Sequence, residues 1–95
     1  MPAATIEVSG DTIAVKGPLV VETVNLLLES TPTFIGSTVE VDLSNTTEVD
    51  SAGLSLLVLW EGQIKQQGGS VTFKAISPQA ASLMQVSGLG HMVGE

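Results

Sequence analysis

The chain contains no cysteine, no arginine and a single histidine, His91. Without cysteine there is no disulfide framework, no thiol nucleophile and no cysteine-ligated zinc site. One histidine leaves most metal-ligand sets incomplete and argues against a His-based catalytic triad. We therefore expect no metal site and no cofactor, and we expect that the protein is not an enzyme.

Positive charge is also scarce. Ten acidic residues face three lysines, which gives a formal net charge of −7. This charge repels phosphate backbones, and the side chain best suited to bidentate phosphate binding is missing. Nucleic acid is accordingly excluded as an expected partner.

Long apolar segments are absent. The longest nearly continuous apolar run, from Leu54 to Trp60, is interrupted by Ser55 and is far shorter than the roughly 20 residues that span a bilayer. The chain also does not open with a basic region followed by an apolar one, as a secretory signal would. We expect a soluble cytoplasmic protein with no direct membrane insertion.

The composition that is present favours one folded domain over residues 1–95. Hydrophobic residues make up 43% of the chain and charged residues only 14%, which is far from the composition of disordered proteins. A chain of 95 residues is too short for two independent cores. Any function must therefore lie on one small surface.

Alternation of apolar and polar residues predicts a series of strands. The first two form a hairpin around the turn Ser9-Gly10-Asp11, and a fifth, short edge strand is suggested near the end. The expected strands cover residues 4–8, 12–16, 38–43, 70–76 and 91–93.

Helical spacing and capping residues predict three helices between these strands. The first extends from about Val20 until Ser30-Thr31-Pro32 ends the pattern, and the second from Ala52 to Gln67 before Gly68-Gly69. The third begins with Ser77 as cap and Pro78 at the first helical position, and continues to about Val86. The order of elements predicts an α/β fold with a four- to five-stranded mixed sheet and about three helices packed on it.

The second expected helix is more apolar than an ordinary surface helix, because its apolar side chains point in nearly every direction. One interpretation places it between the other two helices, which bury both of its flanks. The other makes it a docking helix with Trp60 as a large anchor, in which Leu56, Leu57, Trp60 and Ile64 divide between the sheet and a partner-facing surface. Both interpretations can hold together.

The start of this helix carries a candidate switch. Ser51 follows Asp50 where backbone N–H groups point outward and favour a negative charge, so the position tolerates a phosphate. Asp50 and the nearby Asp42 and Glu48 would add to the repulsion of a docked surface, which makes phosphorylation a release signal. The alternative is that Asp50 and Ser51 only cap the helix. A Mg²⁺ site on the three carboxylates is a weaker interpretation, and no nucleophile or phosphate loop accompanies them for catalysis.

Several short motifs together give the chain a resemblance to the STAS family over nearly its whole length. The most specific is Asp50-Ser51-Ala52-Gly53-Leu54, directly after a strand that ends in Asp42-Leu43-Ser44. The others are Gln66-Gln67-Gly68-Gly69 before a strand, Ser77-Pro78 at the last helix, and Ser87-Gly88-Leu89. The resemblance implies a STAS-like single domain.

The resemblance also implies the kind of partner. STAS proteins include anti-sigma-factor antagonists, domains of anion transporters and the small cytoplasmic subunit of the Mla phospholipid-transport ABC complex. The resemblance implies one of two roles for Ser51. The residue either accepts a phosphate from an anti-sigma-factor kinase or contacts the ATPase subunit of the transporter. Asp50, Ala52 and Gly53 complete the switch loop. The segment 10–15 looks more like the Mla subunit, and Gly17-Pro18-Leu19-Val20 departs from the Gly-Glu-Leu-Asp of many antagonists.

The remaining candidates are weaker. His91 lies in a glycine-rich tail and is expected to be exposed rather than a ligand or base, while Met84 and Met92 are expected to fill gaps in the core. A small-ligand module with a cleft beside the switch loop is a third possible class of function. The two main hypotheses, a transporter subunit and an anti-sigma-factor antagonist, differ in whether Ser51 is a contact residue or a phosphate acceptor.

Overall fold

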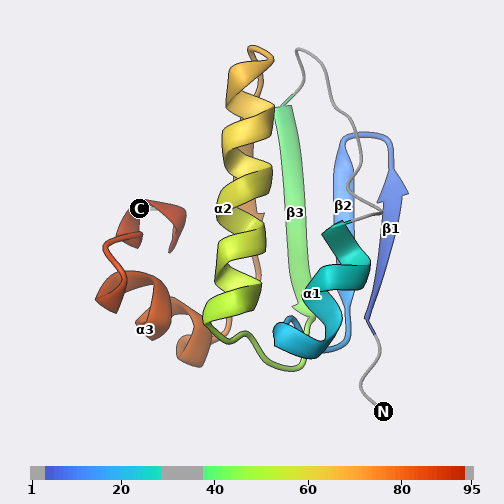
Figure 1. Cartoon of the computed structure of the whole chain (residues 1–95). Coiled ribbons are helices and arrows are strands. Elements are labelled where there is room, and N and C mark those ends of the chain that lie inside the picture. The colour runs from blue at the N-terminus through green and yellow to red at the C-terminus, as the bar shows by residue number, and fades with distance from the viewer. Residues whose placement is uncertain (1–3, 29–37, 94–95) are drawn as a thin grey trace.

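The computed structural model describes residues 4–28 and 38–93, which form a four-stranded mixed sheet with helices against it (Figure 1). The strands β1 (Thr5–Ser9) and β2 (Thr12–Lys16) form the expected antiparallel hairpin. The strands β3 (Thr38–Asn45) and β4 (Ser70–Lys74) follow in parallel, so the order across the sheet is β1-β2-β3-β4. The α/β class and the mixed sheet are confirmed.

The three expected helices are present as α1 (Val21–Leu28), α2 (Ser51–Gln66) and α3 (Pro78–Val86). Figure 1 shows α1 and α2 side by side in front of the sheet, with α3 beyond α2. The cap of α3 and the end of α2 lie where the sequence predicts them. Ser77 Oγ accepts a hydrogen bond from Ala80 N at 3.1 Å, and Gly68 adopts a φ of 85° after α2. The end of α1 expected at Ser30-Thr31-Pro32 lies outside the described residues.

The core lies between the sheet and the helices. Alternate residues of the strands face it, and Val39, Val41 and Leu43 are buried while the intervening Glu40 and Asp42 are only half-buried. Met84 and Met92 are also buried, as expected for gap-filling side chains. No helix in the described ranges is both long and apolar enough to cross a bilayer.

The structure corrects the expected fifth strand. The segment from Gly90 to Val93 is a short 3₁₀ helix, η1, that packs beside α3 and β4. Leu89 N donates to Met84 O at 2.7 Å, and Met92 N donates to Leu89 O at 2.9 Å, so the backbone closes into turns. Met92 then enters the core, which an edge strand at this position would not require.

The structure also corrects the expected orientation of the apolar residues of α2. All four candidates for a divided surface are buried between the helices and the sheet: Leu56 (1% exposed), Leu57 (0%), Trp60 (1%) and Ile64 (4%). The prediction that they divide between the sheet and an outer surface is wrong. Of the alternative interpretation, a helix covered on both flanks, the structure supports the flank on which α1 packs against α2.

Candidate functional site

The segments that precede α1 and α2 are joined by backbone hydrogen bonds at the edge of the sheet where β2 and β3 end. Leu19 N donates to Glu48 O at 2.8 Å, and Asp50 N donates to Leu19 O at 3.0 Å. Leu19 and Val49 thereby form a parallel bridge beyond the strands, and both side chains are buried. The loop before Ser51 is therefore a continuation of the sheet.

One carboxylate serves the N-termini of both helices. Asp50 Oδ1 accepts a hydrogen bond from Gly53 N at 3.0 Å, which makes Asp50 the cap of α2. Asp50 Oδ2 accepts a second hydrogen bond from Val21 N at 3.2 Å, at the first residue of α1. An anionic acceptor suits both helix ends, because each carries unpaired N–H groups and a partial positive charge.

Gly53 allows α2 to approach the preceding loop closely. A Cβ built at this position would lie 2.0 Å from the carbonyl oxygen of Leu19, an atom already held by Asp50 N. Any larger residue must push the helix away from the β2–α1 connection. Gly53 is therefore needed for packing, and Ala52 beside it is half-buried.

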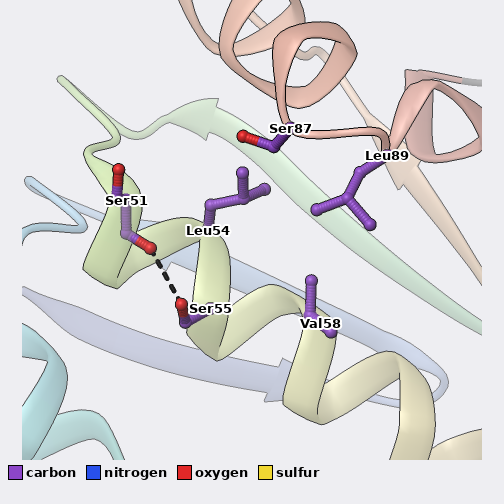
Figure 2. A pocket seen from close by; sticks show the side chains of 6 residues that line it. All are labelled: Ser51, Leu54, Ser55, Val58, Ser87 and Leu89. Carbon is purple, nitrogen blue, oxygen red and sulfur yellow. Dashed lines mark hydrogen bonds between the residues drawn. The ribbon is translucent and has the colours of Figure 1, made fainter.

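Ser51 is the first residue of α2 and is exposed. Because Asp50 provides the cap, the Ser51 hydroxyl is not the group that caps the helix. The backbone carbonyl of Ser51 accepts a hydrogen bond from Ser55 Oγ at 3.0 Å, shown as a dashed line in Figure 2. The two serines thus lie on the same outer side of the first turns of α2.

A groove of about 270 Å³ begins at Ser51 and extends between α2 and the turn that joins α3 to η1. Figure 2 shows that one wall comes from α2 and the other from the turn, with the three serines toward one end and Val58 and Leu89 toward the other. Its lining consists of Ser51, Leu54, Ser55, Val58, Ser87 and Leu89. None of these six described residues has a charged side chain.

The outer stripe of α2 is also uncharged over its first three turns. We define this stripe as Ser51, Ser55, Val58, Leu59 and Gly62, which recur at helical spacing and are all exposed. Val58 is 37% exposed and Leu59 is 41% exposed. These two residues, rather than the four predicted ones, present apolar surface outward. Spacing counted from Ser51 could have identified them, because Ser55 follows Ser51 by four residues and Val58 and Leu59 follow Ser55 by three and four.

The neighbouring carboxylates do not form a metal site. Asp42 accepts a hydrogen bond from Ser44 N at 2.9 Å, and the Ser44 amide, its hydroxyl and the charge of Lys74 hold the pKa of Asp42 below its usual value of 3.8. Within residues 4–28 and 38–93, no three acidic or histidine side chains are placed to hold a metal ion. Asp42 thus binds the backbone of its own turn, whereas Asp50 binds backbone amides at the N-termini of α1 and α2.

His91 is exposed, as predicted, and contacts α2. Its Nε2 lies 3.1 Å from Glu61 Oε1, and Lys65 Nζ lies 3.6 Å from the other oxygen of Glu61. These contacts tie the C-terminal turn to the middle and end of α2, away from Ser51. We assign them a structural role.

The chain is similar to known proteins over most of its length. The family described as "Mlab, STAS domain" matches residues 3–94. The intermembrane phospholipid transport system binding protein MlaB of Escherichia coli K12 is 30% identical over 81 residues, which cover 85% of this chain and 84% of that protein. MlaB of Shigella flexneri matches with the same values.

Solved structures show the same fold. The anti-sigma factor antagonist SpoIIAA in its unphosphorylated form superposes with a TM-score of 0.70 at 20% identity, covering 94% of this chain and 84% of that chain. A STAS-domain protein from Planctomyces limnophilus gives a TM-score of 0.66 at 18% identity, covering 90% and 81%. By their names, MlaB is a binding protein of an intermembrane phospholipid transport system, and SpoIIAA is an antagonist of an anti-sigma factor. The sequence match over nearly the whole length, together with the fold, shows that this chain belongs to the STAS domain family.

Proposed function

We propose that this protein is a non-enzymatic accessory subunit that docks on the ATPase subunit of a phospholipid-transport ABC complex. The observation that carries the proposal is the 30% identity to MlaB over 85% of this chain and 84% of that protein. On this proposal the chain acts on the cytoplasmic side and reaches the membrane only through its partner.

The docking surface in this proposal is the outer stripe of α2, which begins at Ser51. The stripe is exposed and uncharged and carries two exposed apolar side chains, which favours a surface that becomes covered. Val58 and Leu59 would supply the apolar contact, and the Ser51 hydroxyl would lie at its edge. Asp50 and Gly53 would act indirectly by holding Ser51 in place.

A second candidate is an anti-sigma-factor antagonist in which Ser51 accepts a phosphate. The exposed hydroxyl at the first residue of a helix of 16 residues favours it, since the helix N-terminus accommodates an added negative charge. The likeness to SpoIIAA supports only the shared fold, because the identity is 20%. We therefore rank this candidate second.

A titration separates the two functions. The purified chain is added to the ATPase subunit of the phospholipid-transport complex from the same genome, and in parallel to an anti-sigma-factor kinase from that genome with ATP. The proposal expects binding and increased ATP hydrolysis in the first case, with no mass increase of the chain in the second. A phosphate on Ser51 in intact-mass spectra, without binding to the transport ATPase, would favour the antagonist instead.

A further inference from the structure

We propose that the groove between α2 and the α3–η1 turn receives an aliphatic side chain from a basic segment of the ATPase partner. This inference rests on the proposed function and adds the chemistry of the partner segment. It concerns a second wall of the docking surface, formed by Ser87 and Leu89, which lies outside the switch loop and outside α2.

The shape and lining of the groove fit a protein side chain. Leu54, Val58 and Leu89 supply aliphatic surface, while Ser51, Ser55 and Ser87 place hydroxyl groups around it. Its volume of about 270 Å³ is at the lower edge of the roughly 300–1,000 Å³ typical of small-molecule pockets. An aliphatic anchor that displaces water from the apolar surface is the better match, as in interface hot spots.

Two exposed carboxylates near the N-terminus of α2, outside the lining of the groove, favour a basic partner. Glu22 follows the residue whose amide binds Asp50, and Glu48 accepts a backbone hydrogen bond from Leu19, so both flank the N-terminus of α2. Both side chains are exposed.

The lysines do not neutralise this end of the molecule. Lys16, Lys65 and Lys74 are already within ion-pair distance of Glu7, Glu61 and Glu40, respectively. In the described ranges no lysine forms an ion pair with Glu22 or Glu48. A Lys or Arg on the partner would complement this negative potential and speed association.

The same charges argue against a second copy of this chain as the occupant. Two copies would each bring a net charge of −7 and would place acidic residues near one another if they met at this end. Like charges at an interface oppose association. A basic segment of a different protein avoids this repulsion.

Two pairs of variants test the groove, with binding to the purified transport ATPase measured by titration. Val58→Glu puts a charge into the groove, and Val8→Glu makes the same change at an exposed valine on β1. We expect binding to weaken about 30-fold or more for Val58→Glu, and to stay unchanged for Val8→Glu.

The charge pair compares Glu48→Lys with Asp11→Lys, which makes the same change at the exposed hairpin turn. Glu48→Lys should slow association and reduce its dependence on salt, while Asp11→Lys should change neither. Thermal melts of all four variants establish that each remains folded.

The outcomes distinguish this inference from the function on which it rests. No binding of the unaltered chain to the ATPase overturns the proposed function. Normal binding by the unaltered chain and equally by Val58→Glu overturns the groove inference alone. A concentration-dependent dimer in sedimentation that Val58→Glu abolishes would also overturn it, because the occupant would then be a second copy.

A photo-crosslinking side chain in place of Ser87 identifies the segment directly. Mass spectrometry of the crosslinked ATPase should find a peptide with an aliphatic residue close to Lys or Arg. A crosslinked segment rich in Asp and Glu would contradict the expected charge complementarity. The same crosslinker in place of Val8 serves as the control and should capture no ATPase peptide.

Discussion

The carboxylate of Asp50 binds the backbone amide of Val21, which lies 29 positions earlier in the chain. Through this bond and the bond to Gly53 N, a single side chain fixes the first turns of two helices relative to each other. The position of Ser51 is consequently set by α1 as well as by α2.

Replacing Asp50 by alanine should cost more stability than the loss of an ordinary cap. An N-cap is worth about 1 kcal/mol, and the second bond to Val21 should raise the loss to about 2 kcal/mol. Urea denaturation measures the change. Ser77→Ala, which removes a cap with one bond at α3, is the matched comparison. An equal loss in both variants would mean that the Asp50–Val21 bond contributes no stability.

Two glycines of α2 should respond in opposite ways to alanine. Gly53→Ala places a methyl group against the Leu19 carbonyl, and we expect a loss of about 1–3 kcal/mol or more from overpacking. Gly62→Ala meets open space, and should raise stability by roughly 0.5–1 kcal/mol because alanine favours the helix. Thermal and urea unfolding of the two variants give the comparison, and a tolerated Gly53→Ala would contradict the close approach.

Leu57 and Leu59 should separate stability from binding. Leu57→Ala removes a fully buried side chain and should cost about 2–5 kcal/mol of folding free energy. Leu59→Ala affects an exposed side chain, so its stability should change by less than about 1 kcal/mol while its affinity for the ATPase falls. Full binding by Leu59→Ala would remove this residue from the docking surface.

Ser51→Asp should weaken partner binding without unfolding the domain. A charge desolvated at an interface costs on the order of 2–5 kcal/mol, which corresponds to about 30-fold to several-thousand-fold in affinity. Fold stability should hardly change, because an anion is favourable at a helix N-terminus.

Ser51→Ala then distinguishes the two candidate functions. The transport subunit should lose some stimulation of the ATPase, whereas an antagonist should remain permanently able to bind its kinase. Thermal melts and titrations with both partners provide the measurements. Unchanged binding of Ser51→Asp to either partner would place the interface elsewhere.

Asp42 should contribute a small acid-sensitive stabilisation. The hydrogen bond from Ser44 N lowers the pKa of the Asp42 carboxyl below 3.8 in the folded chain, so the ionised form of Asp42 is favoured in the folded state. The contribution is complete above the unfolded pKa and is lost as the pH falls through the folded value. Asp42→Asn should therefore be less stable than the parent chain at neutral pH, with the difference shrinking below pH 3.8. A difference that is constant with pH would contradict this.

Most of the fold could be predicted because local patterns and tertiary structure agree. The hairpin turn around Gly10, the cap Ser77 and the stop at Gly68 each have a local physical cause, and each appears where expected. The prediction of a strand in the final segment was wrong because His91-Met92-Val93 is too short for periodicity to distinguish a strand from a helical turn.

The site could be predicted only in part. The Asp50-Ser51 motif identified the start of α2, but sequence spacing does not show how wide a face the neighbouring helices cover. Leu56 and Trp60 were thus expected partly outside, whereas α1 and the sheet bury them. The double role of Asp50 and the approach of Gly53 to Leu19 depend on contacts distant in sequence, which no local pattern contains.

The bridge between Leu19 and Val49 has a consequence for the thermodynamics of association. Its backbone bonds already order the segment before Ser51 in the unbound chain, so docking need not restrict that backbone. When a loop becomes ordered only on binding, its loss of conformational entropy lowers the affinity. A loop that is already ordered does not have this loss. Association at this end should accordingly resemble the meeting of two rigid bodies, with the amides of Leu19 and Asp50 protected from hydrogen exchange before any partner arrives.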